Sequence, residues 1–212
     1  MSFDINLGIV IIAISALGYV SNWLNWRLLH FKIVHFFYFL GAFVHESSHA
    51  LLCLLTGAKI LEFQAFSGKP HVTYAKPKLA ILSNPLISFA PIAGGLLFLW
   101  LVNKFVLAGY FVIPELLVWQ NIFSDTIKLL AQINVMAWQS WVMILLFLNV
   151  GAMIGPSARD LKNIWPVLIL LLFVKSQFFI HLGLLAVMLI LVNITIQVAL
   201  FMVWEVFVRP RA

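Results

Sequence analysis

The residues most able to do chemistry in this chain form one short motif, His45-Glu46-Ser47-Ser48-His49. An α-helix completes a turn in about 3.6 residues, so the two histidines of an H-E-x-x-H motif lie on one face, one turn apart. Two imidazoles in that relation can bind one zinc ion, and the glutamate beside them can take a proton from water. The motif therefore predicts a site for one Zn²⁺ ion, with His45 and His49 as ligands and Glu46 as the general base.

The motif lies inside an apolar segment that is long enough to cross a bilayer. Ionisable groups in the middle of a membrane cost about 2.5–3.5 kcal/mol each on insertion scales, so they are kept there mainly where they have a function. The alternative is that both histidines hydrogen-bond neighbouring helices while Glu46 stays protonated. Three such groups within five residues favour the metal site over this alternative.

A catalytic zinc site needs a third protein ligand and an open position. Among the few carboxylates we choose Asp160, because it follows a helix break at Gly155-Pro156 that lets side chains turn inward. Ser157-Ala-Arg-Asp160 also matches a capping box, in which Ser157 begins a helix and Asp160 caps it. From the residues alone, ligand and cap are equally supported, and a different class of membrane metalloprotease would take its ligand from Glu115 instead.

The elements that position these residues are expected to lie in a membrane. Of the 212 residues, 64% are hydrophobic and 9% are charged, whereas soluble domains are about half apolar and about a quarter charged. A water-soluble fold of this size cannot hide so much apolar surface, so the lipid bilayer is the expected solvent. The net charge of +6 comes from basic residues in short segments between apolar runs, which argues against nucleic acid as a partner.

The hydrophobic pattern predicts an all-α polytopic membrane protein, formed as a single domain over residues 1–212. A span needs about 20 apolar residues, and about six transmembrane helices are expected, at residues 7–24, 33–55, 79–102, 140–154, 157–179 and 181–208. A small membrane-associated β-hairpin, residues 59–74, should follow the second span at the membrane surface. Residues 114–133 are expected to form an amphipathic helix lying on the interface.

The distribution of basic residues predicts an orientation. With six spans, eight of the 13 lysines and arginines fall on one side and five on the other. Cytoplasmic segments carry the excess of positive charge. We therefore expect a multi-pass protein of a prokaryotic plasma membrane, with the hairpin and both termini cytoplasmic. No cleavage site follows the first apolar run, which is expected to be a retained span.

These features together resemble the site-2 protease family of intramembrane zinc metalloproteases, in a compact branch without a PDZ-like insertion. The features in common are H-E-x-x-H in one span, a short hairpin directly after it, and Pro156-x-x-x-Asp160 at the start of a later span. The resemblance covers residues 35 to 165, roughly, judged by motif order. It implies that Asp160 is the third zinc ligand beside His45 and His49, and that Glu46 is the catalytic glutamate.

The resemblance also implies a substrate, which is a transmembrane protein or peptide cut in or near its membrane segment. In this family the hairpin offers an edge strand to an extended substrate, so residues 60–66, with Phe66, are the expected counterpart. An asparagine upstream of the proline belongs to the family pattern, and Asn149 is its expected equivalent. The rival function is a non-proteolytic zinc-binding membrane scaffold or transporter. The absence of a sequence repeat argues against transport, and the oligomeric state stays open.

Overall fold

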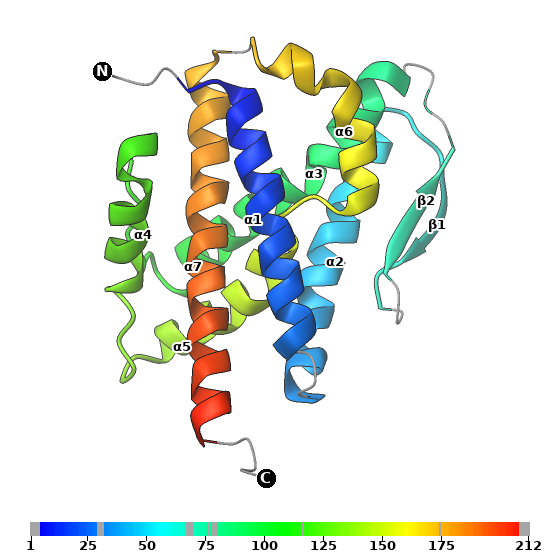
Figure 1. Ribbon diagram of the computed structural model, residues 1–212. Helices are drawn as coiled ribbons and strands as arrows, with labels where there is room; N and C mark the ends of the chain where they lie inside the picture. The colour runs from blue at the N-terminus through cyan, green and yellow to red at the C-terminus, as the bar shows by residue number, and fades with distance from the viewer. Residues whose placement is uncertain are drawn as a thin grey trace.

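The computed structural model describes residues 5–28, 32–66, 70–75, 77, 80–115, 117–173 and 175–207. They form helices and one two-stranded antiparallel sheet (Figure 1). The helices are α1 (Leu7–Leu28), α2 (Lys32–Leu55), α3 (Ala80–Leu101), α4 (Ile122–Leu130), α5 (Trp138–Leu146), α6 (Ala158–Leu171) and α7 (Gln177–Phe207). The strands are β1 (Ile60–Gln64) and β2 (His71–Tyr74). Short π-helical segments, η1 (Val102–Val106) and η3 (Phe147–Gly151), continue α3 and α5, and a 3₁₀ turn, η2 (Trp119–Asn121), precedes α4.

Four of the described helices contain stretches long and apolar enough to cross a bilayer, namely Leu7–Asn25, Tyr38–Leu55, Ser83–Val106 and Gln177–Val206. A shorter apolar helix covers Trp138–Gly151. The protein is thus a helical membrane protein, but the predicted count of about six spans is not confirmed. The expected fifth span stops at Leu171 as α6, whose 14 residues rise about 21 Å against a hydrocarbon core of about 30 Å. The polar residues Lys175 and Ser176 directly precede α7, which begins at Gln177.

Helices α1 and α7 pack together and run in the same direction. Asn193 Nδ2 donates a hydrogen bond to Ser21 Oγ over 2.7 Å, and Gln197 Nε2 donates one to Asn25 Oδ1 over 2.5 Å. Because the residue numbers rise together along both helices, the start of α1 and the end of α7 lie at opposite ends of the bundle (Figure 1). Two parallel helices that both cross a bilayer would place those ends on opposite sides of it, whereas the sequence predicts that both termini are cytoplasmic.

The helix that carries the H-E-x-x-H motif, α2, is held tightly between its neighbours by glycines. A Cβ atom on Gly94 of α3 would overlap Ser48 Oγ, and one on Gly41 of α2 would overlap the backbone oxygen of Asn149 in η3. Small residues at such crossings let helix backbones approach closely inside a membrane. The position of α2 relative to α3 and η3 is therefore tightly fixed, and with it the position of the motif.

The hairpin folds back along α2 and does not lie beyond its end. Gly57, with a φ of +71°, ends α2 and reverses the chain. Phe66, just after β1, then stacks on Phe43 of α2 with the ring centroids 5.3 Å apart. From Phe43 to Leu55, α2 rises about 18 Å, so the end of β1 reaches toward the middle of α2 (Figure 1). The predicted hairpin exists, and it packs along the second half of α2.

The predicted amphipathic helix of residues 114–133 is shorter than expected. It is reduced to α4, which packs against α7 and runs alongside it (Figure 1). Ile122 and Leu129 are buried, whereas Phe123 and Ile127 are exposed. Because apolar side chains occupy both sides of α4, the helix can bury one face in the bundle and turn the other toward lipid.

Candidate metal centre

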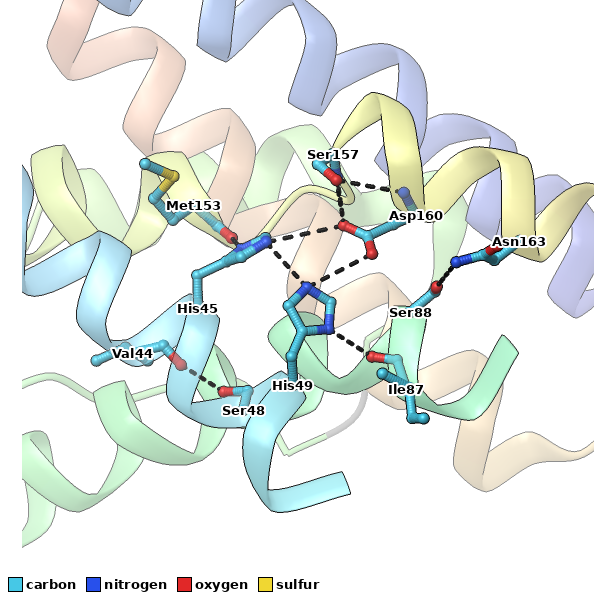
Figure 2. Close-up of polar contacts among 10 residues, drawn as sticks. All are labelled: Val44, His45, Ser48, His49, Ile87, Ser88, Met153, Ser157, Asp160 and Asn163. Carbon is cyan, nitrogen blue, oxygen red and sulfur yellow. Dashed lines mark hydrogen bonds and ion pairs between the residues drawn. The ribbon is translucent and has the colours of Figure 1, made fainter. Parts of the chain in front are cut away.

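His45 and His49 of α2 meet Asp160 of α6 inside the bundle (Figure 2). The two Nε2 atoms are 3.3 Å apart, and Asp160 Oδ2 lies 3.7 Å from His45 Nε2. The other carboxylate oxygen, Oδ1, lies 3.4 Å from His49 Nε2. All three residues are buried, and among the described residues no other group of ligand atoms converges in this way. The triad could hold a metal ion.

The His49 ring is oriented by a backbone carbonyl that a proline leaves free. His49 Nδ1 lies 2.8 Å from the carbonyl oxygen of Ile87 in α3 (Figure 2). In an uninterrupted helix that carbonyl would accept the N–H group four residues later, but this residue is Pro91, which has none. The His49 Nδ1–H group donates to Ile87 instead, which leaves the lone pair of Nε2 available to a metal.

The His45 ring is oriented in the same way by the end of another helix. His45 Nδ1 lies 2.8 Å from the carbonyl oxygen of Met153. The chain breaks at Gly155-Pro156, so the N–H group of Ser157 does not continue the helix and donates to Asp160 Oδ2 over 2.9 Å. The carbonyl of Met153 therefore lacks its helical partner and accepts from His45.

Asp160 caps its helix and faces the histidines at the same time. Its Oδ2 atom accepts hydrogen bonds from Ser157 N–H and Oγ over 2.9 and 2.5 Å. In return, the Asp160 N–H group donates to Ser157 Oγ over 3.2 Å, which completes the predicted capping box. Asn163, one turn along α6, donates to Ser88 Oγ of α3 over 3.1 Å and holds α6 in place. The sequence leaves two roles open for Asp160, helix cap and metal ligand. In the structure its position is compatible with both.

The electrostatics of the triad call for a cation. Burial by itself raises the pKa of the Asp160 carboxyl, but the two imidazoles and the Ser157 hydrogen bonds outweigh it and hold this pKa well below its usual range. Asp160 is therefore ionised. Its carboxylate and two imidazole lone pairs face one another across 3.3–3.7 Å, which is favourable only with a proton or a metal ion between them.

Glu46 shares a cavity of about 320 Å³ with the triad. The cavity is also lined by Pro70, His71, Val72 and Tyr74 of the hairpin and by Ser157, Arg159 and Asn163 of the α6 region. Glu46 is buried, and no described residue donates a hydrogen bond to it. A buried, unpaired carboxylate beside a metal site can accept a proton from a water molecule in the same cavity.

Three residues named by sequence reasoning do not line this cavity. Phe66 stacks on Phe43 on the outer side of α2. Asn149 is buried in η3, where its Nδ2 atom donates to the Leu145 carbonyl over 2.7 Å and its Oδ1 atom has no partner among the described residues. Glu115, the alternative ligand, is exposed and lies outside the triad. The structure brings together His45, Glu46, His49 and Asp160, and leaves these three elsewhere.

The sequence reasoning missed two features of the cavity wall. The first is β2, which lines the cavity in place of the predicted segment 60–66. The second is Arg159. The sequence does carry a signal for this residue: a cation in the first turn of a helix opposes the helix dipole, so its presence there calls for a reason other than helix stability. The strand could not be chosen from the sequence, since only the packing on α2 decides which one faces the motif.

Comparison with known proteins finds no matching family model, no matching curated protein and no matching solved structure.

Proposed function

We propose that this protein is an intramembrane zinc metalloprotease of the kind that the site-2 protease family represents. The observation that carries the proposal is the triad of His45, His49 and Asp160, with Glu46 in the same cavity. The two histidines and Glu46 lie in a helix stretch, Tyr38–Leu55, that is suited to cross a bilayer. A peptide bond within or near a membrane segment is the substrate that such a location favours.

The spacing of the three ligand atoms supports zinc as the metal. Zinc ligands at about 2.0–2.2 Å in a tetrahedron are separated from one another by about 3.3–3.6 Å, and the two Nε2 atoms are 3.3 Å apart. Asp160 turns a different oxygen to each ring, at 3.4 and 3.7 Å, and one ligand atom from each of the three residues lies within 4.8 Å of the others. Two imidazoles and one carboxylate leave the fourth position open, which is typical of catalytic zinc. The backbone carbonyls on both Nδ1 atoms also match the usual support of zinc-binding histidines.

The cavity residues then have distinct tasks in hydrolysis. When bound, zinc supplies a Lewis acid that polarises a peptide carbonyl and acidifies water. Glu46 accepts the proton of the attacking water and passes it to the leaving amine. Asp160 stays ionised and holds its place through Ser157, so it balances positive charge without moving.

The free edge of β2 is the part of the hairpin suited to hold an extended substrate. Amide groups alternate in direction along a strand, and the Ala75 N–H group donates to the Lys59 carbonyl before β1 over 2.9 Å. The amides of Val72 and Tyr74 therefore point away from β1, and both residues line the cavity. This supports substrate binding by β-strand addition at β2, which replaces the expected use of residues 60–66.

The test combines metal content with cleavage in reconstituted full-length protein. The purified protein is expected to contain one zinc ion and to cut a fluorogenic transmembrane peptide in liposomes. Glu46→Gln should keep zinc and lose activity by roughly 10²–10⁴-fold, since only proton transfer is removed. Asp160→Ala should lose zinc, whereas Glu115→Ala, the matched control, should keep it.

Two results would overturn the proposal. The first is a Glu46→Gln protein that cuts the peptide at the normal rate. The second is a wild-type protein that binds zinc and cuts none of a broad set of transmembrane peptides, which would favour the non-proteolytic zinc-binding scaffold or transporter.

A further inference from the structure

Arg159 is a cation in the wall of the cavity, and no residue that the structure describes pairs with it. It lines the same 320 Å³ cavity as His45, His49 and Asp160. None of the described residues forms an ion pair or a hydrogen bond with the Arg159 side chain. Arg159 is also exposed to solvent. It is also the only lysine or arginine in the described lining of the cavity.

The position of Arg159 is unfavourable for helix stability. It lies in the first turn of α6, directly before Asp160. The N-terminus of a helix carries a partial positive charge, so a cation there is destabilising where an acidic residue would stabilise. Only 9% of the residues of this chain are charged. Stability alone therefore does not account for an arginine at this place.

The other charges of the cavity make an anion the matching ligand for Arg159. Glu46 and Asp160 are the acidic residues in the lining, and a divalent ion at the triad would balance both. His71 faces Glu62, with Nε2 3.4 Å from Oε2. With the metal bound, the guanidinium is left as uncompensated positive charge. Its planar fork of N–H donors fits a carboxylate in a bidentate manner.

Arg159 is the direct sequence neighbour of Asp160, a member of the triad. Arg159 and Asp160 are adjacent, so their Cα atoms are about 3.8 Å apart. The guanidinium lies near enough to Tyr74 of β2 to act on its phenol: burial raises the pKa of Tyr74, and Arg159 opposes the rise. A peptide extended along β2 advances about 3.3 Å per residue. A group bound by Arg159 therefore belongs to one of the few residues next to the scissile bond.

We infer that Arg159 is a specificity-determining residue that binds a carboxylate of the substrate peptide beside the scissile bond. The inference rests on the proposed function and narrows its substrate class to peptides with an acidic group at that place. The carboxylate belongs either to an Asp or Glu side chain or to a C-terminus. A lipid phosphate is the weaker candidate, because Lys162, on the same exposed side of α6, does not line the cavity whereas Arg159 does.

The experiment measures peptide binding separately from cleavage. Zinc-loaded, full-length Glu46→Gln protein in nanodiscs of neutral phosphatidylcholine is titrated with labelled transmembrane peptides. The peptides differ at one position next to the proposed cleavage site, which holds Glu, Gln or Lys. A further pair ends there as a free acid or as an amide. We expect the Glu or the free-acid peptide to bind about tenfold more tightly than its neutral counterpart, as a partly exposed, charge-assisted pair allows.

Charge exchange at residue 159 then tests the assignment. In the same background, Arg159→Gln should abolish the preference for the carboxylate, and Arg159→Glu should reverse it in favour of the Lys peptide. Lys162→Gln is the matched control, with one cation removed from the same helix outside the cavity, and should keep the preference. Zinc content equal to that of the parent shows that each variant retains the site.

Each of the other possible results either overturns or supports the role of Arg159. Equal binding of all peptides by the parent protein overturns the inference, and so does an Arg159→Gln variant that weakens every peptide to the same extent. An effect of Arg159→Gln that appears only when anionic lipid is added would assign the arginine to the bilayer and also overturn it. Carboxylate-selective binding without cleavage by the wild type would sustain this inference and reject the proteolytic function.

Discussion

Each imidazole of the candidate metal site is held by a backbone carbonyl without a helical donor. Pro91 withholds the N–H group that would otherwise bond to Ile87, and the break at Gly155-Pro156 does the same for Met153. A buried carbonyl without a donor is costly, so each histidine both satisfies a carbonyl and gains a fixed ring orientation. The prolines thus act on the site through the backbone, at a distance from the ligand atoms.

Replacing Pro91 with alanine is expected to weaken metal binding. The new N–H group at position 91 would bond to the Ile87 carbonyl within α3 and compete with His49. Loss of such support for a ligand typically lowers metal affinity about 10–100-fold. Competition with a zinc-binding dye measures the affinity, while α3 itself should gain stability because a helical hydrogen bond is restored.

Pro85→Ala is the matched control for this prediction. Pro85 lies in the same helix, and its missing N–H group would point to residue 81, whose carbonyl orients no residue of the described site. Zinc affinity should therefore stay near that of the wild type. Equal affinity in the Pro91→Ala and Pro85→Ala proteins would contradict the role assigned to Pro91.

Among the helices, α1 and α7 are joined by polar side chains buried between two apolar spans. Ser21 and Asn25 of α1 meet Asn193 and Gln197 of α7, and all four are at most 1% exposed. Interhelical hydrogen bonds of this kind stabilise membrane bundles by about 0.6–2 kcal/mol. Asn193 Oδ1 and Gln197 Oε1 already lack hydrogen-bond partners within the described protein. The loss of a further hydrogen bond at this contact should therefore destabilise the protein.

A pair of substitutions tests this contact. Ser21→Ala removes the acceptor of Asn193 Nδ2 and leaves the whole amide buried without a protein partner, which should cost about 1–3 kcal/mol of unfolding free energy. Adding Asn193→Leu removes the stranded amide, so the double variant should recover at least half of that loss. Reversible unfolding in mixed micelles, followed by helical circular dichroism, gives the values. A double variant less stable than Ser21→Ala would show that the amide is satisfied in another way.

For the whole molecule, the parallel arrangement of α1 and α7 leads to a prediction about membrane topology. The described ends of the chain lie at opposite ends of the bundle (Figure 1). Arg27 in the last turn of α1 and Lys32 at the start of α2 lie at one end of the bundle, and the end that bears the hairpin and α6 contains Lys59, Arg159 and Lys162. The greater positive charge at the hairpin end still favours the cytoplasm for that end.

Epitope tags at the two ends of the chain are therefore expected on opposite sides of the membrane. In sealed, inside-out vesicles, added protease should remove the N-terminal tag and spare the C-terminal tag, because only the start of α1 lies at the hairpin end. Detergent should expose both tags and serves as the control for sealing. Removal of both tags from sealed vesicles would show that α1 and α7 do not both cross the bilayer in parallel.

Local pattern in the sequence was sufficient for the helical membrane class, for the pairing of His45 with His49 on one helix face and for the capping box of Ser157 and Asp160. These depend on residues at most four positions apart, whose relation is set by helix geometry. The same applies to the hairpin strands, which follow α2 directly. The number of spans could not be predicted in the same way, because an apolar run such as 157–179 does not reveal where a helix breaks within it.

Only the tertiary structure decided how these local elements meet. The support of His49 by Ile87 joins residues 38 positions apart, and that of His45 by Met153 joins residues 108 positions apart. The same holds for the approach of Asp160 to both histidines, for the placement of β2 along the cavity and for the shared direction of α1 and α7. Such contacts depend on how apolar helices pack against each other, and apolar surfaces are alike in sequence until glycines, prolines and buried polar groups select one packing.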